Sequence, residues 1–412
     1  MTTTQPCSQR HHGRRDQRLL VGAVAVSTAG DFLAIIALAL SLRHVSGSGF
    51  AVAGLFMALW GPAVVLAGLA GLVADRFENR AIIVAVSLAQ VVVVVALAFV
   101  DSLAAILALT TLLGIGFALA QPAEFALLPV VAGEQRLAVV NGHMETARYL
   151  GMTAGPLLGG ALAAAGGTRL ALLVDAATFA AVAAAAWALR ARRRPVRSGD
   201  GARDRARDGI AFLVGDRTLA LVMGVAFTSL LFMTATATAE VFFATDVLDA
   251  GELGYGVLMT AWTAGMVLGA VAVARRVPSA LLVPAALGFV ALQGLGIALP
   301  ALWLAFGFAA GAFVVGGVAH ATKNVLVRTL IHERVPDALR GRAFAAYSGL
   351  RNGAELFALA GGGLLVTTLG ARWTMLIAGA GAVVAGLAGV AIWRLAQRRA
   401  AVATAGAEPQ PA

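Results

Sequence analysis

The chain alternates long apolar runs with short polar segments. Phe50 to Ala74 and Ala81 to Val100 contain no charged residue, and runs of similar length recur throughout the 412 residues. A helix of about 20 apolar residues crosses a hydrocarbon core of about 30 Å. Backbone groups facing lipid must bond within their own segment, which requires helices when runs are too long for barrel strands. We predict twelve transmembrane helices, at 19–42, 50–74, 81–100, 103–121, 138–165, 170–189, 218–243, 254–274, 279–299, 301–320, 343–368 and 373–393.

The longest polar connection separates the predicted spans into two sets of six. It runs from Arg190 to Arg217 and begins with a cluster of arginines. Gly54 to Trp60 is echoed by Gly256 to Trp262, which indicates duplicated halves about 200 residues apart, as in many transporters. We therefore predict an N-terminal tail at 1–18, a six-helix bundle at 19–189, a basic linker at 190–217, a second bundle at 218–393 and a C-terminal tail at 394–412.

The distribution of charge sets the predicted orientation. Hydrophobic residues make up 60% of the chain and mean hydropathy is +0.86, whereas only 13% of residues are charged. If the N-terminus is cytoplasmic, 26 of the 31 Lys and Arg residues lie in cytoplasmic segments and three, Arg43, Arg169 and Arg372, lie outside. This bias is typical of multi-pass membrane proteins with cytoplasmic positive charge. We expect both termini in the cytoplasm of a cell membrane and no binding of nucleic acid.

The loop after the second predicted span has a recognisable composition. Gly71, Asp75, Arg76 and Arg80 form a Gly-x-x-x-Asp-Arg pattern followed by a further base. It resembles the signature loop of the major facilitator superfamily, although Glu78 and Asn79 depart from the usual residues. The resemblance implies two six-helix bundles and a loop that latches spans two and eleven through Asp75 and a base at 340–342. The alternative is a solvated turn that only marks topology.

The fifth predicted span carries a glycine motif. Glycines recur every four residues and form one flat stripe, which allows close approach of a neighbouring helix, and a proline permits a bend. The pattern resembles the motif of the superfamily's antiporters, mainly drug exporters, and implies that spans five and eight pack together as a gate. A facing stripe is available at Gly265 and Gly269. The motif residues are Gly142, Gly151, Gly155, Pro156, Gly159 and Gly160. Generic packing of small residues is the alternative.

Ionisable residues inside spans are the candidate functional groups, because charge is costly within the bilayer. Asp31 lies about 12 residues into the first span, hence about 18 Å deep at 1.5 Å per residue. The resemblance implies a central cavity lined by spans one, four, seven and ten, in which Asp31 could carry a proton or contact substrate. Alternatively, Asp31 hydrogen-bonds neighbouring helices through Ser27 or Thr28.

Two charged pairs have spacings that place both partners on one helix face. They are Glu145 with Arg148, and Arg351 with Glu355. Either pair could be a neutralised structural pair or part of a coupling network. Asp175 and Glu240 are predicted near the external ends of their spans, within reach of water. His320, Lys323 and Asn324 are predicted to end span ten at the cytoplasmic interface.

The sequence lacks the motifs of bond-making chemistry. It has no phosphate-binding Gly-x4-Gly-Lys-Ser/Thr loop and no Cys/His metal cluster. We expect no enzymatic activity, no metal and no cofactor, with a proton gradient as the driving force. Gln121-Pro122 and Asn141 resemble positions recurrent in a branch that includes siderophore and macrolide exporters.

Together these patterns predict an all-α membrane protein, with twelve helices in two bundles, that transports a small organic molecule by alternating access. We expect a monomer that expels its substrate against proton entry, as a drug-type efflux antiporter does. The alternatives are a proton-coupled nutrient importer and, in a different class, a membrane scaffold or enzyme.

Overall fold

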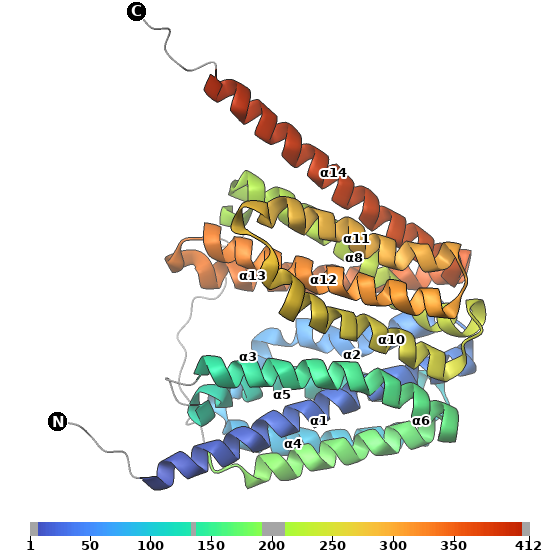
Figure 1. Cartoon of the computed structure of the whole chain (residues 1–412). Helices are drawn as coiled ribbons and strands as arrows, with labels where there is room; N and C mark the ends of the chain where they lie inside the picture. Colours follow the sequence, from blue (N-terminus) through green and yellow to red (C-terminus); the bar gives the residue numbers. More distant parts are fainter. Residues whose placement is uncertain (1–6, 133–136, 192–210, 406–412) are drawn as a thin grey trace, which may run out of the picture. The chain divides into compact units, whose positions relative to one another are not determined.

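The structure is a computed structural model that describes residues 7–132, 137–191 and 211–405 (Figure 1). These residues are almost wholly helical and contain no strand. Within them, nine helices are long and apolar enough to cross a membrane, or ten if the bent pair α2 and α3 counts as one span. The helices are α1 (Cys7–Ser46), α2 (Gly49–Val65), α3 (Ala67–Arg76), α4 (Asn79–Leu97), α5 (Leu103–Ala132), α6 (Leu137–Ala188), α8 (Arg217–Thr236), α9 (Glu240–Phe242), α10 (Gly251–Leu268), α11 (Leu282–Leu302), α12 (Phe306–Arg334), α13 (Asp337–Leu369) and α14 (Ala371–Ala405).

Every predicted span has its helix. The fifth and sixth predicted spans both lie in α6, which has non-helical backbone at Gly167, with φ of 73°. The eleventh is α13, which is not among the nine apolar helices. Short π- and 3-10 segments follow α9 and α10, at Phe243–Val247, Gly269–Val273 and Ala274–Arg276, and another, Ser279–Leu281, precedes α11.

Contacts divide the chain into two compact units. The first unit comprises Met1–Asp200, Glu240–Thr263 and Gly363–Thr368, and the second comprises Gly201–Ala239, Ala264–Gly362 and Leu369–Ala412. The predicted bundles, 19–189 and 218–393, are continuous in the sequence, whereas each contact-based unit combines separate segments. The two divisions are therefore not equivalent, and the bundle boundaries stay a prediction.

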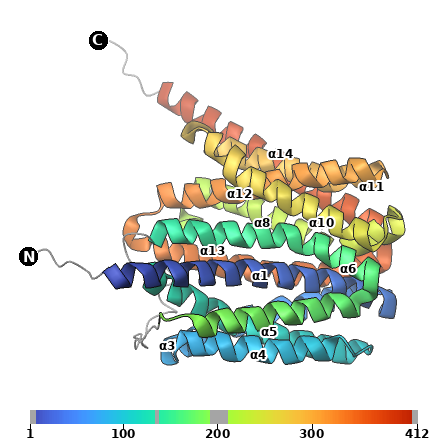
Figure 2. The same ribbon diagram turned by 60° about the horizontal axis from the view of Figure 1, so that its bottom comes forward.

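In the first unit, α1 packs along α6, and α4 and α5 pack beside them (Figures 1 and 2). A buried apolar cluster joins these helices, with Leu20 from α1, Ile82 from α4, Leu127 from α5, and Met144 and Val182 from α6. Burying such side chains between helices, rather than against lipid, lets the surfaces interlock and places the polar residues of α1, α5 and α6 in one region.

The second span bends where α2 meets α3, by 59°. Pro62 lies within α2 and has no backbone N–H, so the carbonyl of Ala58 loses the donor that an unbroken helix supplies. That carbonyl lies against Gly114 of α5, where an added Cβ would come within 2.6 Å of the Ala58 oxygen. The residues just before the proline are therefore in close backbone contact with α5.

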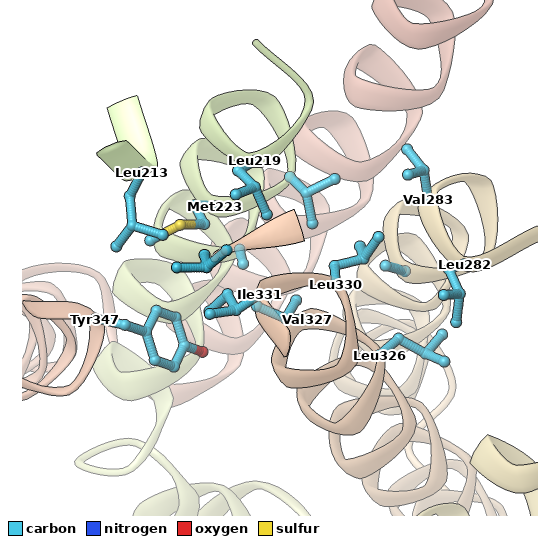
Figure 3. Packing of buried hydrophobic residues seen from close by; sticks show 14 of the residues in the cluster. Leu213, Leu219, Met223, Leu282, Val283, Leu326, Val327, Leu330, Ile331 and Tyr347 are labelled. Atoms are coloured by element: carbon cyan, nitrogen blue, oxygen red, sulfur yellow. The ribbon is translucent and has the colours of Figure 1, made fainter. Parts of the chain in front are cut away.

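In the second unit, α8, α11 and α12 share an apolar core with the end of α13 nearest Tyr347 (Figure 3). Leu219 and Met223 of α8 pack there with Leu330 and Ile331 of α12. The core fixes the helices that carry the charged residues of this unit.

A polar cap precedes α8. The Asp216 carboxylate accepts hydrogen bonds from the backbone N–H groups of Thr218 and Leu219, at 2.8 and 2.9 Å, and pairs with Arg334 at 3.2 Å. Burial alone would raise the pKa of Asp216, but the hydrogen bonds from Leu219 and Arg334 outweigh it and hold the pKa below its usual value. The cap therefore favours the ionised carboxylate.

One pair of contacts shows the internal repeat directly. Arg169 Nε donates to the Ala98 carbonyl at 3.1 Å, and Arg372 Nε donates to the Ala301 carbonyl at 2.9 Å. Both donors and both acceptors are 203 positions apart. Each arginine follows a glycine with positive φ, at Gly167 and its counterpart Gly370 (81°). The predicted duplication is thus visible as the same corner in each unit.

Candidate functional site

A cavity of about 170 Å³ lies inside the first unit. Residues of α1, α2, α4, α5 and α6 line it, and most of them are apolar. The polar or charged lining residues are Ser27, Thr28, Asp31, Ser87, Gln90, Gln121, Glu124 and Arg148. An apolar cavity with a few convergent polar groups is the usual form of a small-molecule site.

Asp31 lines this cavity from α1. The central cavity expected between spans one, four, seven and ten is a different one and stays a prediction, because residues of the first unit alone line this cavity. Ser27, which was the proposed structural partner, lines the same cavity, and Arg148, Glu124 and Asp175 are near enough to interact with Asp31 electrostatically. No Lys, Arg or His of the described residues lies within 4 Å of its carboxylate. Asp31 is therefore a carboxyl group at a cavity wall without a direct ion-pair partner.

Arg148 pairs across helices rather than along its own. Its Nη2 lies 3.5 Å from Glu124 Oε2 on α5, and its guanidinium lies 5.0 Å from the Phe125 ring centre. Glu145, the partner suggested by spacing, is exposed. Glu124 was missed because the fourth span was predicted to end at residue 121, whereas α5 continues to Ala132. The Gln121-Pro122 motif directly before it was the available signal.

Asp175 corrects a second expectation. It was placed within reach of water but is completely buried, and one carboxylate oxygen accepts from Thr178 Oγ1 at 3.0 Å. An added Cβ at Gly30 would overlap this carboxylate, so α1 approaches α6 closely at that point. Asp175 thus lies beside the segment of α1 that carries Asp31.

The glycine stripe of α6 faces a different helix from the one predicted. Added Cβ atoms at Gly151, Gly155 and Gly159 would come within 2.8, 2.6 and 2.8 Å of the carbonyl oxygens of Ala25, Ala29 and Leu33, all on α1. The stripe therefore holds α1 against α6. Span eight contacts α6 at other residues.

Span eight meets α6 beside the stripe. An added Cβ at Gly160 would lie 2.7 Å from the Glu252 carbonyl, and one at Gly256 would lie 2.5 Å from the Pro156 carbonyl. The expected facing pair, Gly265 and Gly269, packs instead on Val314 and Val318 of α12. Gly142 has open space around it. Spacing identified the close-packing faces correctly but not the neighbour of each.

The loop between spans two and three is only partly described. The side chains of Asp75, Arg340 and Arg342 lie outside the described residues, so the latch stays a prediction. An added Cβ at Gly71 would meet no described atom, and Arg76 is exposed at the end of α3.

The next residues of the loop anchor it to neighbouring helices. Arg80 Nη1 donates to the Leu189 carbonyl at 2.8 Å, just after α6 ends. Asn79, which departs from the family pattern, is buried and donates to the Ala123 carbonyl at 3.3 Å. Arg80 thus satisfies a carbonyl at the end of a helix, a favourable place for a cation.

A second polar cluster lies in the second unit. Arg351 Nε and Glu355 Oε1 are 2.9 Å apart, so the predicted pair within α13 is present. Lys323 was expected at a membrane interface but is 2% exposed, because α12 continues eleven residues beyond it to Arg334. These residues, with His320 and Asn324, line a small cavity of about 30 Å³.

Sequence comparison connects this architecture to a known family. The profile of the Major Facilitator Superfamily matches residues 20–359, which is most of the chain and includes both cavities. The chain belongs to the major facilitator superfamily. The predicted all-α major facilitator fold is therefore confirmed, and the protein is a multi-pass membrane transporter of this superfamily.

Individual relatives agree with this assignment. The uncharacterized MFS-type transporter YfiS of Bacillus subtilis (strain 168) is 25% identical over 387 residues, which cover 89% of this chain and 91% of YfiS. Among solved structures, the nucleoside transporter NupG is similar with a TM-score of 0.68, at 16% identity over 92% of this chain and 99% of NupG. A bacterial homologue of the iron transporter ferroportin has a TM-score of 0.71, at 15% identity over 94% of this chain and 99% of its own. These likenesses concern the fold.

Proposed function

We propose that this transporter exports a small organic compound in exchange for protons, with Asp31 as the proton-carrying group. The observation that carries the proposal is the position of Asp31 at the wall of the first-unit cavity, with no cation of the described residues within 4 Å of its carboxylate. A carboxyl group there can gain a proton without first breaking an ion pair.

The surrounding charges support a coupled reaction. Arg148 is held at 3.5 Å by Glu124, so that cation is already largely neutralised. An ionised Asp31 would add a further carboxylate close to Glu124 and Asp175, and like charges repel one another. Either a proton or a substrate group with positive or hydrogen-donating character can relieve that repulsion, so the two compete for Asp31.

Competition of this kind produces exchange. Suppose that the site can switch from one side of the membrane to the other when Asp31 is protonated or when substrate is bound, but not when the site is empty and Asp31 is ionised. Entry of protons and exit of substrate must then alternate. The glycine motif of α6, which resembles that of antiporters, supports export over import. The distribution of Lys and Arg supports a cell membrane location with both termini in the cytoplasm.

Proteoliposomes with an internal pH-sensitive dye test the proposal. Substrates come first from a growth screen, which compares a compound library on cells with and without the protein. Adding a compound found in this way to proteoliposomes should drive proton movement in the direction opposite to the compound. Asp31→Asn should lose this proton movement but keep exchange of labelled for unlabelled compound, and Asp31→Glu should restore part of it.

Asp101→Asn serves as the matched control, because Asp101 is an exposed acid in the same unit. Proton movement in the same direction as the compound would identify an importer. Full proton coupling in Asp31→Asn would remove Asp31 from the mechanism.

A further inference from the structure

The small cavity of the second unit is the repeat counterpart of the first cavity. Arg169 and Arg372 occupy equivalent positions of the two repeats, 203 residues apart. At this offset, seven residues that line the first cavity are equivalent to seven of the nine residues that line the second. Arg148 becomes Arg351, for example, and Gln121 becomes Asn324. The duplication has therefore preserved a cavity at the same place in each unit.

The charges at these places have been exchanged. Phe117 and Ala120 of the first cavity correspond to His320 and Lys323 of the second. Conversely, the acids Asp31 and Glu124 correspond to Thr234 and Val327, which are neutral. Glu355 replaces a methionine but pairs with Arg351.

The exchange leaves the second cavity with one excess cation. Lys323 Nζ contacts the Gln293 side-chain carbonyl at 3.2 Å, and the Gln293 amide is itself directed to Met233 Sδ at 2.8 Å. In the described part of the chain, no carboxylate lies within 4 Å of Lys323 Nζ. Buried charges normally have a charged partner, because burial without one is costly. The ammonium group thus has capacity for an anion and faces space that can hold one.

The apolar residues that line this cavity suit an attached apolar body. The rings of Phe227 and Tyr347 lie 5.9 Å apart between centres, tilted at 49°, and Leu230 and Ala226 also line the cavity. A carboxylate next to Lys323 would therefore extend from an apolar surface. Arg351, already paired with Glu355, would add positive potential without direct contact.

We propose that this cavity binds a carboxylate of the transported compound, so that the substrate is an amphipathic organic acid or zwitterion. The proposal rests on the proposed function only for the statement that the ligand is transported. Binding itself needs no gradient and is tested without one.

The test uses the purified full-length chain in detergent and three probes with one apolar body. These are 4-phenylbutyrate, 4-phenylbutyramide and 4-phenylbutylamine, titrated while thermal unfolding is followed by tryptophan fluorescence. We expect the carboxylate to bind at least about tenfold more tightly than the amide or the amine, since hydrogen bonds between two ionised groups are roughly twice as strong as those between neutral groups. Lys323→Gln should abolish that preference, and Lys323→Arg should retain most of it.

Arg276→Gln is the control, because Arg276 is an exposed arginine of the same unit. It should keep the carboxylate preference of the unmodified chain. Arg351→Gln is a second variant that keeps Lys323, and it should weaken carboxylate binding less than Lys323→Gln does.

Equal binding of the carboxylate and the amide, or binding of neither, overturns the proposal. So does an undiminished preference in Lys323→Gln. A further titration uses sodium chloride in place of the probes. If chloride alone reproduces the stabilisation and prevents the effect of 4-phenylbutyrate, the cavity holds an inorganic anion and the substrate assignment fails. None of these results depends on whether transport is proton-coupled.

Discussion

Two glycines of α6 should respond in opposite directions to the same substitution. Gly155 faces α1, where an added Cβ would lie 2.6 Å from the Ala29 oxygen and 2.7 Å from Phe32 Cβ. Favourable contacts between carbon atoms lie at about 3.5–4.0 Å, so α1 must move by roughly 1 Å. Gly142 is on the same helix, and an added Cβ there would meet no atom within 4 Å.

The magnitudes follow from two opposing effects. Replacing glycine by alanine in a helix gains about 1 kcal/mol at either position. At Gly155 the forced movement costs about 1–3 kcal/mol, as overpacking generally does. Gly155→Ala should therefore lower stability by up to about 2 kcal/mol, while Gly142→Ala should raise it by up to about 1 kcal/mol.

Unfolding in mixed micelles of detergent and sodium dodecyl sulfate measures both variants under one set of conditions. A difference of about 1.4 kcal/mol corresponds to a tenfold change in the folding equilibrium, which is well resolved. Gly155→Leu adds three more carbons to the same contact and should prevent α1 from packing, with loss of transport. Equal shifts in Gly155→Ala and Gly142→Ala would refute the assignment of the stripe to the contact with α1.

Two further predictions concern charged contacts. Glu124→Gln leaves the half-buried Arg148 without its carboxylate and should destabilise the chain by up to about 3 kcal/mol, the value for a fully buried pair. Adding Arg148→Gln should recover much of the loss, as chemical unfolding of both variants would show. A double variant as unstable as the single one would contradict this. Asp216→Ala should cost about 1 kcal/mol at pH 7 through loss of the helix cap. Because the folded pKa of Asp216 is lowered, the charge-dependent part of its contribution is present above the ordinary aspartate pKa and is lost as pH falls through the folded value. Thermal unfolding of the unmodified chain and of Asp216→Asn, measured as a function of pH, checks this, because asparagine retains the cap but not the charge. A loss of stability in Asp216→Asn that stays the same at low pH would contradict the prediction.

Hydropathy predicted the number and order of the spans because each must cross the bilayer by itself. It placed some ends wrongly, since a helix can continue beyond its apolar part when neighbours cover its polar groups. The extension of α5 past residue 121 brought in Glu124, and the extension of α12 past residue 320 buried Lys323. The first error left Glu124 out of the candidate residues, and the second placed Lys323 at the membrane interface.

Periodicity predicted which residues share a helix face but not what covers that face. The Arg351 and Glu355 pair was recovered because both partners lie on one helix. Glu124 could not be assigned to Arg148 by spacing, because their contact joins two helices. The glycine stripe was matched to the wrong neighbour for the same reason.

The carbonyls of Ala58 and Leu59 on α2 lie against Gly114 of α5, so this contact links two distant positions of the sequence. A side chain at 114 is excluded because backbone oxygens already occupy its space, both within 2.6 Å of an added Cβ. Position 114 is thus constrained by the course of another helix and not by the identity of any residue on that helix. A substitution at 58 or 59 leaves those oxygens in place, so the constraint on 114 would not appear as covariation between the two positions.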